Sequence, residues 1–164
     1  MTSVLDLIAA WPGARWLQDS GTAYLFVNAA HILGLALLLG SIVTLDLQLI
    51  ARSSSLRDSS HDSSLAALAA VLSRTAAWGL ALAVLTGLWL FSVRPLDYWG
   101  NAAFLCKLGL LVTALANVAW QHCGADWTKL LNGQGVATGV RVRAALSLLL
   151  WCAVLLAGRW VGFL

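Results

Sequence analysis

Four ionisable side chains interrupt apolar stretches of this sequence, and their types are suited to metal, haem or proton chemistry. His31 and Asp46 lie in one apolar segment, and Lys107 and His122 lie in another. A charged group costs about 2.5–3.5 kcal/mol at the middle of a membrane, so each of the four needs a structural or chemical reason to be there. A neutral imidazole can ligate iron or copper, and an amine without its proton can ligate a metal or relay protons.

The spacing of these residues predicts two polar levels across a membrane. The two members of each pair are 15 residues apart. An α-helix turns by about 100° and rises by about 1.5 Å per residue. The two members of each pair therefore differ by about 60° around the helix axis and by about 22 Å along it. If the two segments are neighbours, His31 and Lys107 share an outer level, and Asp46, Asn117 and His122 share an inner one. The two histidines are then too far apart to clamp one haem.

At the outer level, His31 and Lys107 can converge on one buried ligand, or each can have a simpler role. Lys107 can extend along its own stem to the membrane surface. His31 can bond a backbone carbonyl or Asn28, one turn earlier. Arginines bind carboxylates such as haem propionates or lipid headgroups, and three are expected near this level: Arg15, Arg94 and Arg159.

The inner level is expected to be mainly structural. Asp46 is predicted to form an ion pair with Arg74, which begins the next apolar segment. His122 and the adjacent Cys123 could bind a metal ion together with His61, but scattered ligands of this kind are a weak signal of a metal site.

Composition determines the setting for these residues. The chain has 164 residues, of which 60% are hydrophobic and 10% are charged, and its mean hydropathy is +0.84. Soluble domains are about a quarter charged, so an all-α integral membrane protein is predicted. The net charge of +3 is scattered along the chain, which argues against a nucleic-acid partner and leaves the lipid bilayer as the expected one.

Four apolar segments are long enough to cross a membrane, which requires about 20 helical residues. We predict one transmembrane domain over residues 1–164, a four-helix bundle with spans at residues 24–50, 67–93, 102–120 and 144–162.

The connections between the spans differ in length and polarity. Residues 52–64 and 124–140 are predicted to be polar loops, and residues 94–101 a tight hairpin. Residues 4–17 form a short amphipathic stretch broken at Pro12, which is typical of a helix lying in the membrane interface. The amino terminus lacks the basic start of a signal peptide, so we expect it to be retained.

The basic residues predict an orientation, because cytoplasmic loops carry an excess of Lys and Arg. Six flank or lie in the first and third loops, and three lie on the opposite side. This places both longer loops in the cytoplasm and both termini outside, across a bacterial inner membrane. The six are Arg52, Arg57, Arg74, Lys129, Arg141 and Arg143, and the three are Arg15, Arg94 and Arg159. The expected outer aromatic belt is Trp11, Trp16, Tyr24, Tyr98, Trp99 and Trp160, and the inner one is Trp120 and Trp127.

Small residues predict close helix contacts. Gly79, Ala83 and Gly87 repeat every four residues and form a ridge on which another helix can pack closely. The three cysteines form no CxxC pair and are expected to be small buried side chains without disulfides: Cys106, Cys123 and Cys152.

Several of these segments resemble a family of small uncharacterised bacterial four-helix membrane proteins. The similar segments are 31–42, 46–50, 86–91, 98–107 and 117–122, so the likeness covers nearly the whole chain. The layout is more distantly similar to HemJ-type protoporphyrinogen oxidases and to the copper-resistance D (CopD) domain. HemJ proteins pair an early histidine with a lysine that opens the third span, around a b-type haem. The resemblance implies haem ligation by His31 and Lys107.

Three functional hypotheses follow from the sequence. The first is a b-type haem protein of the inner membrane that takes part in electron transfer, with His31 as an iron ligand. The second is a transport module for a metal ion or small solute, which requires a hydrated cavity between the first and third spans. The third is an accessory subunit without chemistry, which would bind other membrane subunits or a second copy of itself through the Gly79–Gly87 ridge.

Overall fold

Four long helices make up most of the protein in a computed structural model that describes residues 4–52 and 59–163. They are α3 (Gly21–Ala51), α4 (Ser59–Phe91), α6 (Ala102–Cys123) and α8 (Thr138–Trp160). Each contains a segment long and apolar enough to cross a membrane. The described residues include no strand. The prediction of an all-α, multi-pass membrane bundle is therefore confirmed.

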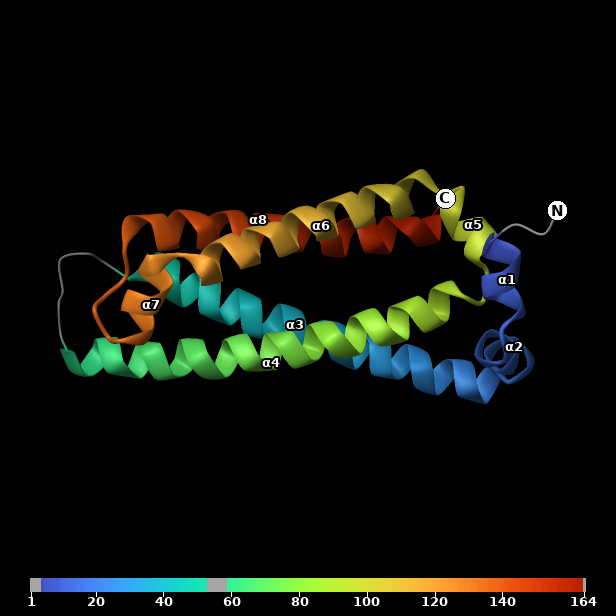
Figure 1. Ribbon diagram of the computed structural model, residues 1–164, viewed down its shortest axis with the longest axis horizontal. Helices are drawn as coiled ribbons and strands as arrows, with labels where there is room; N and C mark the ends of the chain where they lie inside the picture. Colours follow the sequence, from blue (N-terminus) through green and yellow to red (C-terminus); the bar gives the residue numbers. More distant parts are fainter. Residues whose placement is uncertain (1–3, 53–58, 164) are drawn as a thin grey trace.

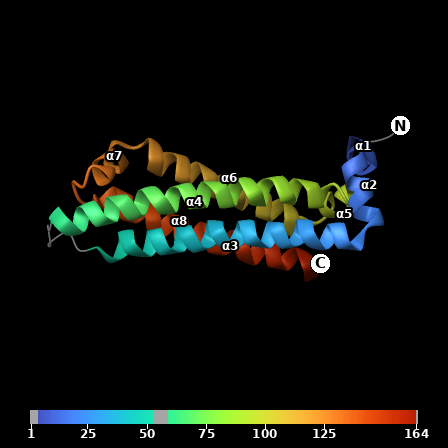
Figure 2. The same cartoon turned by 90° about the horizontal axis from the view of Figure 1, so that it is seen from below.

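The bundle is elongated, and its short helices lie at its two ends (Figure 1). At one end are α1 (Val4–Ala10), α2 (Pro12–Asp19) and α5 (Pro95–Trp99), followed at the end of α8 by a 3-10 turn, Val161–Phe163. At the other end is α7 (Ala125–Leu131). We call these the α5 end and the α7 end. Both chain termini lie at the α5 end, as a second view also shows (Figure 2).

Helices α3 and α4 cross in close contact because glycines lie at the crossing. A Cβ on Gly34 would lie only 2.7 Å from the backbone nitrogen of Ala83, and a Cβ on Gly79 only 2.6 Å from that of Leu38. The predicted small-residue ridge is thus real, but it is covered by α3 of the same chain. That packing removes the surface on which the accessory-subunit hypothesis relied.

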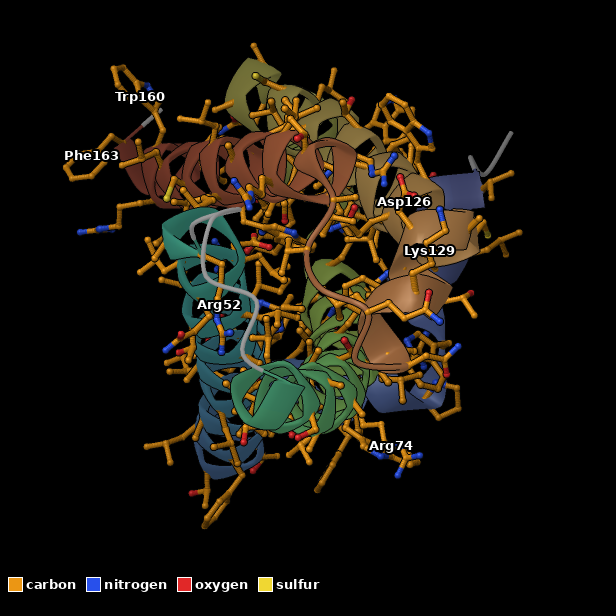
Figure 3. All side chains as sticks on the ribbon, turned by 90° about the vertical axis from the view of Figure 1, so that its left-hand side faces the viewer. Arg52, Arg74, Asp126, Lys129, Trp160 and Phe163 are labelled. Atoms are coloured by element: carbon orange, nitrogen blue, oxygen red, sulfur yellow. The ribbon has the colours of Figure 1, made fainter. Side chains whose placement is uncertain are left out.

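The four long helices are not all neighbours of one another. Helix α3 packs against α4 and α8, and α6 packs against α8. Helix α7 contacts α4, α6 and α8 and thereby fills the space between α4 and α6 at its end of the bundle. The first and third spans, α3 and α6, therefore lie diagonally across the bundle (Figure 3). The adjacency of these two spans, which was the condition for the two predicted polar levels, is therefore not observed.

The polar connection predicted over residues 124–140 is partly a packed helix. Trp127 and Leu130 of α7 are 5% and 2% exposed and join a core cluster that includes Leu49 and Val140. The prediction that Trp127 belongs to an aromatic belt is therefore wrong, because its indole packs inside the bundle. The first loop is shorter than predicted, since α4 already begins at Ser59.

The amino-terminal segment is helical and breaks at Pro12, as predicted. Pro12 occupies the first turn of α2, where a missing backbone N–H is tolerated. Two indoles fasten this segment to the end of α4: Trp11 Nε1 donates to Ser92 Oγ at 3.1 Å, and Trp89 Nε1 donates to the carbonyl of Gly13 at 3.0 Å. The segment lies across the α5 end of the bundle, where an interfacial helix is expected.

The cysteines differ from the prediction in one respect. All three are free, as expected, but their side chains are exposed on the outside of the bundle rather than buried. Helices that span a membrane present apolar side chains outward, so a cysteine there behaves as a small hydrophobic residue facing lipid.

Candidate functional site

His31 is held against α4 by a side chain that fixes its tautomer. Its Nδ1 lies 3.1 Å from Thr86 Oγ1. That hydroxyl donates its single proton to the carbonyl of Leu82 at 2.6 Å, so its oxygen must accept from the ring. The carbonyl of Ala83, 3.4 Å from the same hydroxyl, is a second acceptor for the ring. The neutral ring therefore carries its proton on Nδ1 and a lone pair on Nε2.

The His31 ring packs closely over Gly87, where even a methyl group would be crowded. A Cβ on Gly87 would come within 3.0 Å of the ring carbon Cε1. This distance is shorter than ordinary van der Waals contact, so a larger residue there would push the imidazole away. Gly87, the last member of the small-residue ridge, is thus in contact with the His31 side chain, whereas Gly79 is in contact with the backbone of α3.

Lys107 reaches the level of His31 from the opposite corner of the bundle. Its half-buried stem packs on α8, where a Cβ on Gly158 would lie 3.4 Å from Cε and 3.5 Å from Nζ. The ammonium is close enough for its charge to act on His31. We call this pair the His31 level. The two predicted residues are thus within electrostatic range of each other, although their helices are diagonal.

Two of the three arginines predicted to bind carboxylates, Arg94 and Arg159, lie toward the α5 end. Arg94 is the N-cap residue of α5, and its side chain is exposed. Arg159 follows Gly158 directly, and its guanidinium carbon lies 4.8 Å from the centre of the Phe163 ring. Both are therefore at the surface near the end of the bundle from which the His31 level is reached.

Asp46 lies about 22 Å further along α3, at the wall of a cavity of about 360 Å³. The carboxyl is 6% exposed and accepts a hydrogen bond from Ser147 of α8. Its Oδ2 has no hydrogen-bond partner among the described residues. The expected ion pair with Arg74 is not formed, because the Arg74 side chain is exposed and points away from the bundle (Figure 3).

A network of amides and one arginine joins α6 to α8 beside this cavity. Asn117 Nδ2 donates to the carbonyl of Arg143 at 3.1 Å, and Gln121 Nε2 donates to that of Val140 at 3.2 Å. Arg143 Nε donates to Gln121 Oε1 at 2.7 Å, and its Nη2 lies 3.8 Å from Oδ2 of Asp126. Asn117 therefore does belong to the inner level with Asp46, and its main bonds connect helices.

His122 connects three helices. Its Nδ1 donates to the carbonyl of Val118 at 2.8 Å, and its Nε2 lies 3.4 Å from Ser73 Oγ of α4. Its ring centre is 4.4 Å from that of Trp127 in α7. No group of three or more His, Cys, Asp or Glu side chains that could hold a metal ion occurs among the described residues, and the side chain of His61 lies outside them.

The structure adds residues that the sequence argument did not select. Thr86 orients His31, Ser147 bonds Asp46, and Arg143 organises the α7 end. Thr86 and Ser147 are hydroxyl residues inside apolar spans, so their polarity could have identified them as candidates from the sequence. Only the fold shows that Thr86 contacts the His31 imidazole and that Ser147 contacts the Asp46 carboxyl.

No protein-family model matches the sequence, and neither a curated protein nor a solved structure matches it. Function is therefore argued from the residues at the His31 level and around Asp46.

Proposed function

We propose that the protein is a b-type haem-binding protein of the bacterial inner membrane, with His31 as an axial ligand of the iron and with a role in electron transfer. The single observation that supports this is the bond from Nδ1 to Thr86, which leaves the lone pair on Nε2. Histidines that ligate metals nearly always donate their other ring N–H to an acceptor, which fixes the tautomer and the ring orientation.

The residues at the His31 level fit a haem better than a bare metal ion. A haem brings four nitrogen ligands with it and requires only one or two from the protein. His31 and Lys107 supply two nitrogens at one level, within electrostatic range of each other and on different helices. The haem would supply the one-electron chemistry, and the chain would supply the axial nitrogens and an apolar setting that excludes water.

The surroundings favour the same assignment. Arg94 and Arg159 lie toward the α5 end and could bind the propionates of a haem held at the His31 level. Arg52, Arg74, Lys129, Arg141 and Arg143 lie toward the α7 end and favour placing that end in the cytoplasm. On this orientation both termini and the haem would lie toward the outer face of the inner membrane.

The test is an optical spectrum of the purified protein. The wild-type chain, produced in cells supplied with a haem precursor and purified in nanodiscs, should show Soret and α bands in a reduced-minus-oxidised spectrum. His31→Ala should lose these bands. His122→Ala is the matched control, because this second histidine already bonds Val118 and Ser73 and should leave the spectrum unchanged.

Two outcomes would reject the proposal. One is a wild-type protein without haem bands even after reconstitution with free haem. The other is a His31→Ala protein that is folded and has the full wild-type spectrum. Lys107→Ala separates the roles of the two nitrogens: loss of a second axial ligand should shift the α band, whereas loss of a nearby charge alone should leave its position unchanged.

A further inference from the structure

The cavity beside Asp46 lies between all four long helices and differs in polarity along its length. Leu38, Leu80 and Leu115 line it toward the middle of the bundle. Toward the α7 end its wall is more polar, with side chains from several helices: Ser41, Asp46, Ser73, Asn117, Gln121, Arg143 and Ser147. The apolar part of the cavity therefore lies toward the centre of the bilayer and the polar part toward its surface, which is also how an amphipathic lipid is oriented.

Four buried polar atoms around this cavity have no hydrogen-bond partner among the described residues. They are Asp46 Oδ2, Asn117 Oδ1, Arg143 Nη2 and Trp151 Nε1. Asp46, Asn117 and Trp151 are only 6%, 5% and 2% exposed. Buried polar groups in folded proteins are nearly always hydrogen-bonded. Because all four residues line this cavity, the missing partners of these two acceptors and two donors can be supplied from it.

The cavity is the right size for a small organic group. Its volume of about 360 Å³ is at the lower end of the range of about 300–1,000 Å³ found for small-molecule sites. A bridging water occupies about 30 Å³, so one water would leave most of the space unfilled. The space also reaches the surface of the bundle, since its wall includes the exposed side chains of Arg74 and His122 on α4 and α6.

The charges around the cavity favour a neutral occupant. Asp46 is the acidic group in the wall, and Arg143 is the less exposed of the two arginines there, with Asp126 Oδ2 3.8 Å from its Nη2. Arg74, which also contributes to the wall, points away from the bundle, and His122 already has acceptor and donor partners. A charged ligand group would lie near protein groups of both signs. It would lose its hydration without gaining a single partner of opposite charge to offset that cost.

We propose that this cavity binds the neutral head of a lipid-soluble molecule that carries hydroxyl or carbonyl oxygens. Asp46 and Asn117 accept from a hydroxyl, Trp151 and Arg143 donate to an oxygen, and the apolar part lies along Leu38, Leu80 and Leu115. Quinols and monoacylglycerols share this chemistry. The site lies at the opposite level from His31, so it is independent of haem binding.

The experiment measures binding of decylubiquinol, kept reduced under argon, to the protein in phosphatidylcholine nanodiscs, through saturable quenching of tryptophan fluorescence. Asp46→Leu should weaken binding at least about tenfold, because it removes a hydrogen bond to a buried acidic group. Gln48→Leu, two residues away and exposed, should bind as the wild type does. Ala76→Phe, which places a ring in the cavity wall, should abolish binding, and Val71→Phe on the outer face should not.

Competing probes identify the source of the head. Displacement by monodecanoylglycerol supports a general hydroxyl-bearing head, and its failure to displace supports a quinol ring. Binding that survives in His31→Ala keeps this site separate from the haem proposal. The inference is overturned if the wild type shows no saturable quenching, if Asp46→Leu and Gln48→Leu bind equally, or if decanoate and decyltrimethylammonium displace the quinol as well as monodecanoylglycerol does.

Discussion

His31 and Thr86 are joined across the α3–α4 crossing by a hydrogen bond of 3.1 Å. The threonine hydroxyl gives its proton to Leu82 of its own helix, so the imidazole has to be the donor. A residue on one span thereby sets the tautomer of a histidine on another. This makes Thr86 a positioning residue for any ligand that binds Nε2.

Replacing Thr86 should therefore weaken haem binding without touching the iron. Thr86→Val keeps the β-branched shape but leaves Nδ1–H with one fewer acceptor, and we expect haem affinity to fall about 10–100-fold. Thr86→Ser keeps the hydroxyl and should remain close to wild type. Titration of the haem-free proteins with haem, followed at the Soret band, gives both affinities. Equal affinities for the valine and serine variants would contradict the role assigned to the hydroxyl.

The glycines of α3 should differ sharply in their tolerance of a methyl group. A Cβ on Gly34 would lie 2.7 Å from the backbone of Ala83, whereas one on Gly40 meets nothing within 4 Å. Gly34→Ala should lower the free energy of unfolding by about 1–3 kcal/mol. Gly40→Ala should raise it by about 0.5–1 kcal/mol, because alanine favours the helix. Unfolding in mixed micelles measures both, and equal effects would mean that the crossing can relax.

The sequence predicts those parts of the structure that depend on a single helix. The four spans and the break at Pro12 follow from apolar length and from the missing N–H of proline, which act locally. The partner of Asp46 does not follow, because whether it meets Arg74 or Ser147 depends on how α3 is rotated and on which helix lies beside it. The packing of Trp127 was missed for the same reason, since its burial requires α7 to fold back between other helices.

The bond between Arg143 and Gln121 should contribute more to stability than the exposed ion pair nearby. Gln121→Leu leaves Arg143 Nε and the Val140 carbonyl without their partner in a buried place, at a cost of about 1–3 kcal/mol. Lys129 Nζ lies 3.3 Å from Asp126 Oδ1, but its side chain is 59% exposed, so Lys129→Ala should cost only about 0–1 kcal/mol. Both free energies of unfolding can be measured in the same micelles, and a larger loss for Lys129→Ala would reverse the ranking.

Tyr98 should make the protein less stable at alkaline pH. It lies in α5, outside the spans, with its ring centre 5.5 Å from that of Phe104 and 6.0 Å from that of Phe91. Burial raises the pKa of Tyr98 above its usual value; neighbouring Tyr24 and Asp97 add to the rise, and Arg94 opposes it. Below about pH 10 the phenol is neutral in both the folded and the unfolded chain, so it has no effect on stability there.

As the pH rises above about 10, the unfolded chain releases the Tyr98 proton first, and the folded state loses stability. Tyr24→Phe leaves Tyr98 as the only tyrosine, because the chain has two. The ultraviolet absorbance of tyrosinate in that variant should then titrate above the midpoint of the denatured protein. Tyr98→Phe should remove this part of the alkaline loss of stability. A folded-state midpoint at or below the denatured one would show that the ring between α4 and α6 is open to water.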